Sequence, residues 1–209
     1  MTAPAPTRIA PVTPLHVVPP LEEIDLAGAA RAAADFLNAL GVATETAATT
    51  DTPARMARAY AEMLSPRSFD LTTFPNDEGY DELVLARAIP VQSVCEHHML
   101  PFLGTAHVGY LPGQRILGLS KLARVVEHFG HDLQVQERLT QQIADWLVDH
   151  LQPKGVGVVL EAEHLCMSLR GVQAAGSRTV TSALHGLLRD DGRSRQEFFA
   201  LTGIGAGPH

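Results

Sequence analysis

Two consecutive helical segments stand between groups of strand-like segments, and this order constrains the fold more than any other feature of the chain. Apolar side chains at helical spacing predict helices at 120–130 and 134–151. Segments rich in β-branched and apolar residues predict strands at 80–94, 103–111, 115–119, 155–162, 165–170 and 178–183. The order strands, two helices, strands is typical of an α+β domain, so we predict an antiparallel sheet covered by an antiparallel helix pair.

The helix pair would cover one face of such a sheet. The other face and the edges would stay open, and natural proteins pair or cover open edges. We therefore predict a homo-oligomer in which copies of the chain complete one another's sheets.

The sequence divides into three regions. Residues 1–20 contain six prolines, which fix φ and remove backbone donors, so we predict a mobile tail there. Residues 21–65 form an N-terminal helical segment with one Ala-rich helix ending at Gly41 and a second helix capped by Thr52. Its apolar residues, among them Ile24, Phe36 and Leu40, would be available for burial. Residues 66–209 form the catalytic α+β domain, with helix caps at Ser120 and Ser194.

The chain has 209 residues and a net charge of −7, with its ten histidines counted as neutral. This charge repels phosphate backbones, so we expect no nucleic-acid partner, and any phosphate ligand needs a local basic cluster. Two cysteines are too few for a disulfide framework, and the sequence shows neither a secretory signal nor a run of 18 apolar residues. We expect a cytoplasmic protein that does not associate with membranes.

Both cysteines stand beside histidines, in Cys95-Glu96-His97-His98 and His164-Leu165-Cys166. Thiolates and imidazoles together suit zinc. Four protein ligands would close the site, whereas three would leave room for an activated water. Spacing leaves the choice between His97 and His98 open, because an extended backbone puts His97 on the side of Cys95 and a turn would bring His98 there. Two ordinary buried cysteines beside incidental histidines are the alternative.

Four segments resemble the GTP cyclohydrolase I family: SVCEHHMLPF at 93–102, GLSKLAR at 118–124, QVQERLT at 134–140 and HLCMSLRG at 164–171. The resemblance covers about residues 50–200. It implies the family's tunnelling fold in a ring-shaped oligomer, a decamer of two pentamers with active sites shared between subunits. It also implies conversion of GTP to 7,8-dihydroneopterin triphosphate and formate, the first step of tetrahydrofolate and pterin biosynthesis.

The same resemblance implies a set of site residues. Zn²⁺ would be held by Cys95, His98 and Cys166, with His97 and His164 left free for proton transfer. Glu137 would recognise the guanine edge, where a carboxylate suits two adjacent N–H donors, with Gln136 nearby. The triphosphate would be bound by a group of polar and basic residues: Ser120, Lys121, Arg124 and Arg170, with Arg55 from a neighbouring subunit.

Two further functions stay open on the sequence. One is a non-catalytic zinc scaffold in which His164 or His97 is a fourth ligand, and the other is a related tunnel-shaped pterin or deazapurine enzyme. The chain departs from the family pattern at Gly130-His131-Asp132, where basic residues are expected. His107 is predicted to be a structural histidine with satisfied hydrogen bonds, and Trp146 to be a core residue.

Overall fold

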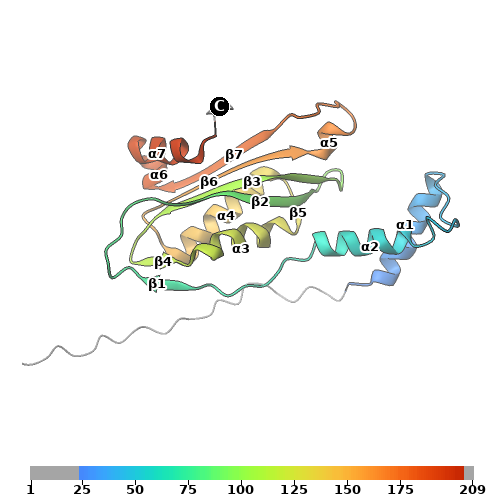
Figure 1. Ribbon diagram of the computed structural model, residues 1–209, viewed down its shortest axis with the longest axis horizontal. Coiled ribbons are helices and arrows are strands. Elements are labelled where there is room, and N and C mark those ends of the chain that lie inside the picture. Colours follow the sequence, from blue (N-terminus) through green and yellow to red (C-terminus); the bar gives the residue numbers. More distant parts are fainter. Residues whose placement is uncertain (1–23, 205–209) are drawn as a thin grey trace, which may run out of the picture.

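The computed structural model describes residues 24–204, so the predicted tail at 1–20 lies outside the described residues. Within this range the chain forms a twisted sheet with helices on both faces and a helical hairpin at one end (Figure 1). The α+β class predicted from the sequence is confirmed. None of the helices between residues 24 and 204 combines the length and apolarity that a membrane span needs.

The main sheet has five strands in the order β5-β2-β3-β6-β7. Its long strands pair in antiparallel fashion, while the short β5 runs parallel to the end of β2. Their bounds are Val84–Cys95 for β2, Pro101–Leu111 for β3, Leu133–Gln134 for β5, Gly155–His164 for β6 and Thr179–Gly186 for β7. A separate two-stranded sheet joins β1 (Thr73–Pro75) to β4 (Arg115–Leu117).

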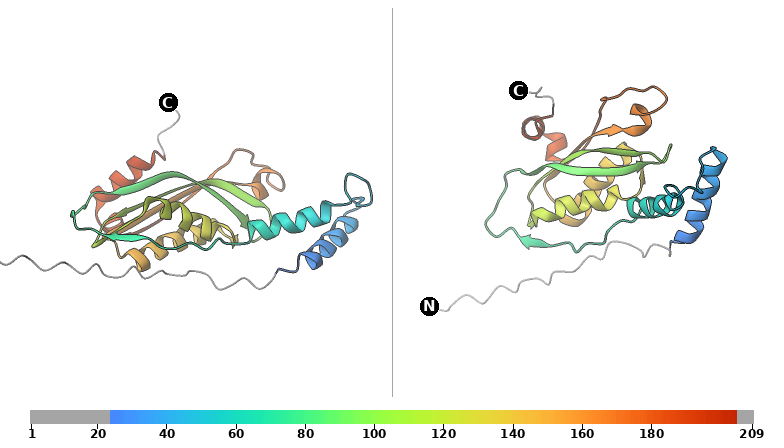
Figure 2. Two further views of the ribbon diagram at one scale, coloured as in Figure 1. Left: turned by 60° about the horizontal axis from the view of Figure 1, so that its bottom comes forward. Right: turned by 45° about the vertical axis from the view of Figure 1, so that its right-hand side comes forward.

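Helices α3 (Leu119–Gly130) and α4 (Gln136–Leu151) cover one face of the main sheet (Figure 2). Alternate residues of β3, including Phe102, Ala106 and Val108, point into this layer and are fully buried. They meet apolar residues of the two helices, such as Leu122 and Ile143, in one continuous core. The predicted helix pair and its role as the cover of the sheet are therefore confirmed.

The short α6 (Leu187–Asp190) leads into α7 (Gly192–Thr202), which lies on the opposite face of the sheet (Figures 1 and 2). Phe198 of α7 is fully buried against Gly109 and Gly157, which are partners in the β3–β6 ladder. A β-carbon at Gly157 would lie 2.7 Å from the Phe198 ring, so the two glycines leave the space that this ring fills. The second face is thus partly covered by the chain itself.

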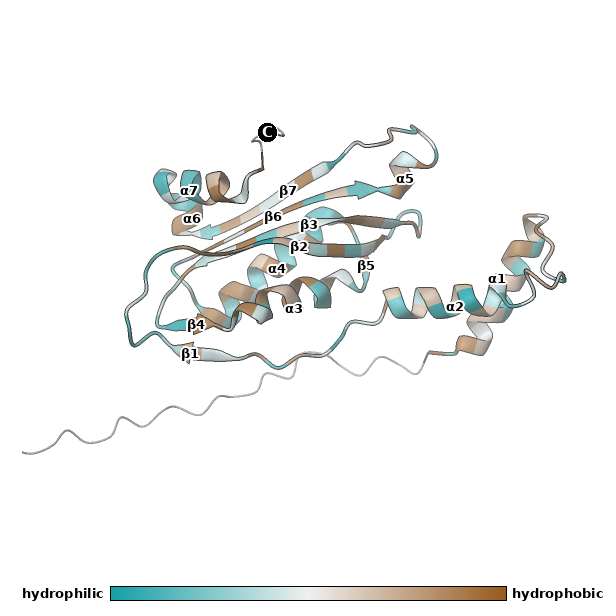
Figure 3. Ribbon diagram, in the orientation of Figure 1, coloured by the Kyte–Doolittle hydropathy of each residue, from teal (hydrophilic) through white to brown (hydrophobic). Residues whose placement is uncertain are grey.

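The N-terminal helices α1 (Leu26–Ala39) and α2 (Thr52–Met63) pack against each other beside the sheet domain (Figure 1). Apolar residues expected to be buried stay exposed, with Phe36 at 55% and Leu40 at 64% of their accessible surface. In Figure 3 much of the ribbon of α1 has the brown colours of hydrophobic residues. Residues 24–204 of a single copy therefore leave the apolar side of α1 uncovered.

Several predicted helix caps are wrong by one to three positions. Asp51 is the N-cap of α2, while the Thr52 hydroxyl accepts a hydrogen bond from Arg55. Gly118 is the N-cap of α3, which leaves Ser120 inside the helix. Asp191 caps α7, because its carboxylate accepts from both the backbone N–H and the hydroxyl of Ser194.

One predicted strand is wrong, and the strand predicted at 115–119 is present but ends at Leu117. Residues 165–168 form the short helix α5 (Leu165–Ser168), because β6 ends where its partner β3 begins and the chain then turns back on itself. β4 pairs with β1, a strand that the sequence did not predict, and its Leu117 N–H donates to the Tyr110 hydroxyl.

His107 departs from its prediction. Its Nδ1 and the Nε1 of Trp146 are buried side-chain nitrogens without a hydrogen-bond partner in the described part of the chain, although Trp146 does lie in the core as expected. Burial lowers the pKa of His107, and the charge of Arg87 lowers this pKa further, which favours the neutral ring.

The contact of Phe198 with the paired glycines should hold α7 on the sheet. We expect Phe198→Ala to lower the free energy of unfolding by about 3–5 kcal/mol, because it leaves a cavity between the helix and the sheet. Leu201→Ala in the same helix is the control, since Leu201 is 45% exposed. Chemical denaturation measures both variants, and equal losses would contradict the proposed anchoring by Phe198.

Candidate metal centre and adjoining pocket

A tight turn after β2 carries the first cysteine–histidine motif. Cys95 is the last residue of β2, and its carbonyl accepts hydrogen bonds from the backbone N–H groups of His98 and Met99. The turn closes where the Cys95 N–H donates to the Leu100 carbonyl. Both histidine side chains consequently return to Cys95, with the Nδ1 of His98 3.9 Å and the Nδ1 of His97 4.0 Å from the Cys95 Sγ.

The second motif reaches the same point from β6. His164 ends β6, and the following helix α5 carries Cys166, whose Sγ lies 3.9 Å from that of Cys95. The potential ligand atoms of Cys95, His98 and Cys166 all lie within 4.8 Å of one another. Both cysteines are buried free thiols, so two sulfurs and one imidazole converge from opposite sides of β3.

The electrostatics of this cluster favour a bound cation. Burial raises the pKa of the Cys166 thiol, the neighbouring Cys95 sulfur raises it further, and Arg170 opposes both effects. Two adjacent thiolates without a counter-ion would therefore be costly, whereas a metal ion stabilises thiolates by direct coordination. Soft sulfur ligands with one imidazole suit zinc, so the donor set fits the ion expected from the sequence.

A pocket with a volume of about 300 Å³ adjoins the cluster. Besides the three clustered residues, its walls include His97, His164, Gln136 and Glu137. Glu137 is exposed in the first turn of α4, and its charge raises the pKa of His164. Burial of the His164 ring is the larger effect and lowers this pKa overall. An acidic side chain, two histidines and a candidate metal group thus share one cavity.

His164 is held on two sides. Its ring stacks on Phe102, with ring centroids 4.6 Å apart and planes 13° from parallel. Its Nε2 lies 2.8 Å from the side-chain oxygen of Gln136. Gln136 itself is 1% exposed, and its amide nitrogen makes hydrogen bonds within the fold. His164 is therefore fixed beside the cluster and its Nε2 is directed at Gln136.

An ion pair missed in the sequence links the metal-binding turn to α4. Arg138 donates to the carboxylate of Glu96 and to the Leu133 carbonyl, and the hydrogen bond from Arg138 lowers the pKa of Glu96. The other oxygen of Glu96 lies 3.9 Å from Nε2 of His97. Glu96 and Arg138 lie inside recognised motifs, next to Cys95 and Glu137. This proximity in sequence to two site residues was the only signal that could have pointed to the ion pair.

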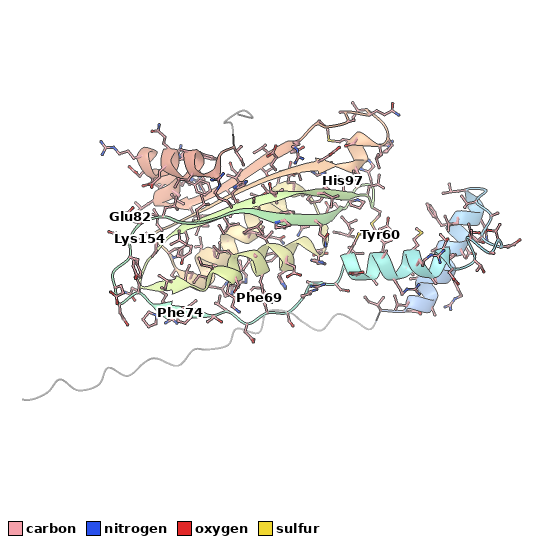
Figure 4. The ribbon with its side chains drawn as sticks, viewed as in Figure 1. Tyr60, Phe69, Phe74, Glu82, His97 and Lys154 are labelled. Atoms are coloured by element: carbon pink, nitrogen blue, oxygen red, sulfur yellow. The ribbon has the colours of Figure 1, made fainter. Side chains whose placement is uncertain are left out.

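The basic residues predicted to bind phosphates do not all gather at this pocket. Ser120, Lys121 and Arg124 lie in the first half of α3. From Ser120 the helix rises by roughly 15 Å to its last residue, Gly130, which packs against the Gln92 carbonyl. Along β2, Gln92 precedes Cys95 by three residues, which is roughly 10 Å of extended backbone. Figure 4 shows the separation, since His97 and Phe74, which lies beside Gly118 at the start of α3, are at opposite ends of the domain.

The two remaining arginines differ in position. Arg170 follows α5 and lies near enough to Cys166 for its charge to affect that thiol. Arg55 lies on α2, where its guanidinium is 3.6 Å from the Asp51 carboxylate and donates to the Ala48 carbonyl. Within one copy of the chain, Arg170 belongs to the surroundings of the pocket and Arg55 is engaged by its own helix and the preceding loop.

Comparison with known proteins gives consistent results. The family model of GTP cyclohydrolase I matches residues 29–203. GTP cyclohydrolase 1 of Aquifex aeolicus is 50% identical over 166 residues, which cover 79% of this chain and 90% of that protein. The protein of the same name from Mycobacterium avium is 49% identical over 197 residues, which cover 92% of this chain and 95% of that protein.

The cluster geometry predicts which substitutions remove a bound metal. We expect Cys166→Ser to lower zinc affinity by more than the roughly 10–100-fold that loss of an outer-shell partner costs, because a neutral hydroxyl replaces a thiolate ligand. His164→Ala should retain zinc, since His164 lies outside the group formed by Cys95, His98 and Cys166. Metal content after dialysis, measured by mass spectrometry, tests both variants. Zinc loss in His164→Ala would instead support a four-ligand scaffold.

Proposed function

Since the chain belongs to the GTP cyclohydrolase I family, we propose that it converts GTP to 7,8-dihydroneopterin triphosphate and formate at the pocket beside Cys95, His98 and Cys166. This reaction is the first step of tetrahydrofolate and pterin biosynthesis. The observation that carries the proposal is the convergence of two thiols and one imidazole next to two further histidines and Glu137.

Cys95, His98 and Cys166 would hold a zinc ion in this proposal. Such an ion supplies Lewis acidity and brings the pKa of a coordinated water towards neutrality. A group of three protein ligands supports an open site, as catalysis needs. His164 lines the same pocket but lies outside the group of three residues whose ligand atoms come within 4.8 Å of one another, which argues against His164 as a fourth, closing ligand. A cytoplasmic setting belongs to the proposal, because a reducing compartment keeps both cysteines available as thiolates.

Glu137 would select guanine. Its side chain is exposed at the pocket wall in the first turn of α4, where no hydrogen-bond partner within residues 24–204 is recorded for its carboxylate. A carboxylate can accept from the two adjacent N–H groups on the pairing edge of guanine. Adenine lacks this donor pair and would leave the carboxylate unpaired, which is the kind of polar mismatch that rejects a substrate strongly.

His164 and His97 would move protons during the reaction. Water addition to carbon 8 of the purine requires a proton on the neighbouring ring nitrogen, and we assign its delivery to His164, which is fixed between Phe102 and Gln136. His97 is more exposed, lies beside Glu96 and lines the same pocket. We assign to His97 the later proton transfers that accompany ring opening, sugar rearrangement and ring closure.

The triphosphate site would be completed by another copy of the chain. Ser120, Lys121 and Arg124 lie in the first half of α3 and do not line the pocket beside the metal cluster of their own copy, so another copy would have to bring such residues to that pocket. The apolar side of α1 is also exposed, and such surfaces typically mark contacts between proteins. Both observations support a homo-oligomer with shared active sites, which we propose to be the decamer of two pentamers implied by the resemblance, with Arg55 also serving a neighbouring site.

Incubation of the zinc-loaded protein with GTP tests the reaction directly. We expect stoichiometric formate and, after oxidation of the product, pterin fluorescence. ATP in place of GTP should yield neither, and removal of zinc by a chelator should abolish both signals while the circular dichroism spectrum is retained. A protein that releases no formate from GTP would refute the proposed activity.

Mixing of two inactive variants tests whether the sites are shared. Lys121→Ala and Cys166→Ser would each inactivate every site of a homogeneous oligomer. After the two proteins are dissociated and reassembled together, some sites should combine an intact Lys121 with an intact metal group from another copy. Activity should therefore return in part, whereas hybrid oligomers without recovered activity would show that each site is built within one chain.

A further inference from the structure

We propose that Gln136 is a positioning residue, which holds His164 with its Nε2–H directed into the fold and leaves Nδ1 as the ring atom facing the reaction. The inference rests on the proposed function in taking His164 as the group that delivers a proton. It changes the role expected for Gln136 from a contact with the substrate to a contact with the histidine.

The orientation of the Gln136 carboxamide is set by its surroundings. Its nitrogen lies 3.0 Å from the Leu160 carbonyl oxygen and 2.9 Å from the Thr179 carbonyl oxygen. Both partners are acceptors, so the amide group facing them must be the donor NH₂. If the carboxamide were rotated by half a turn, its oxygen would face two carbonyl oxygens in a site that is 1% exposed.

A neighbouring pair of hydroxyls agrees with this orientation. The Gln136 nitrogen also lies 3.1 Å from the Thr181 Oγ1, and Thr181 is 2.6 Å from the Thr140 Oγ1. Thr140 in turn donates to the Gln136 backbone carbonyl. The Thr181 hydroxyl can therefore accept from Gln136 and donate to Thr140, so that each group in this buried chain has a partner.

The remaining atom of the carboxamide decides the state of His164. Gln136 Oε1 can only accept a hydrogen bond, and it lies 2.8 Å from His164 Nε2. Nε2 must therefore carry a proton, and in the neutral ring Nδ1 then holds the lone pair. The stack on Phe102 keeps the ring in its plane, so rotation that would exchange the two nitrogens has to break both contacts.

The consequence for the reaction is a defined path for the proton. When His164 is protonated, the proton that it can release without losing the Gln136 contact is the one on Nδ1. Release from Nδ1 returns the ring to the neutral form that Gln136 stabilises. Gln136 thus acts on the reaction through His164, without touching substrate, in the way that outer-shell partners orient functional histidines.

Nuclear magnetic resonance of the zinc-loaded enzyme, with ¹⁵N-labelled histidine rings, tests the inference directly. Ring nitrogen shifts distinguish a protonated from an unprotonated nitrogen, and the His164 signals are those that vanish in His164→Ala. We expect neutral His164 to carry its proton on Nε2 in the unmodified enzyme. A proton on Nδ1 would overturn the proposal, and this measurement does not depend on whether any Gln136 variant folds.

Kinetics provide the second test. Gln136→Met keeps the side-chain length and removes the acceptor for His164, so we expect kcat to fall by about 10–100-fold with the KM for GTP and the zinc content unchanged. Thr181→Val is the matched control, because it removes hydrogen bonds from the same buried chain but leaves Gln136 Oε1 on His164. Equal losses of kcat in the two variants would show that Gln136 serves the fold alone.

Different results would refute the proposed reaction with GTP and the positioning role of Gln136. If the unmodified protein releases no formate from GTP, the proposed function is refuted while the ring-nitrogen shifts still decide the state of His164. If formate is released but Gln136→Met raises KM and leaves kcat unchanged, Gln136 contacts the substrate as the sequence implied, and the positioning role is refuted.

Discussion

The position of β3 between β2 and β6 is the constraint on which the candidate site depends. β3 pairs with the end of β2 through Val94 and Pro101, and with the end of β6 through Phe102 and His164. Both neighbouring strands therefore end beside the first residues of β3. Cys95 and Cys166, which are 71 residues apart in sequence, come within 3.9 Å because the turn after β2 and the helix after β6 close over the same point.

Helix α4 connects this point to the core. Leu139 and Ile143 are fully buried between the helix and the sheet, so the register of α4 is determined by packing. The first turn of the same helix supplies Gln136, which is directed at β6 and β7, and Glu137, which lines the pocket. Adjacent helical residues point about 100° apart, so one helix end can support a histidine with one residue and face a ligand with the next.

Two features of residues 24–204 support the proposed association between copies of the chain. α7 covers part of the second sheet face through Phe198, whereas the apolar residues of α1 stay exposed and the basic residues of early α3 lie at the far end from the metal cluster. Association of several copies of the chain would cover the exposed apolar surface and could also bring separated parts of a binding site together. Both features therefore support the proposed oligomer with shared active sites.

The sequence by itself determined the α+β class, the helix pair and the group of cysteines and histidines, because periodicity and residue chemistry are local properties. It predicted a strand at 165–170 and caps at Thr52, Ser120 and Ser194, and these were wrong: residues 165–168 have no partner strand within the described part of the chain, and each of the three helices begins after a neighbouring residue one to three positions earlier, between which local preference does not choose. Only the tertiary structure decided that His98 comes together with both cysteines, that Arg138 holds Glu96 and that Gln136 faces His164. Each of these contacts joins residues whose separation depends on how the chain turns or on how distant strands pair, and spacing along the sequence carries no information about such distances.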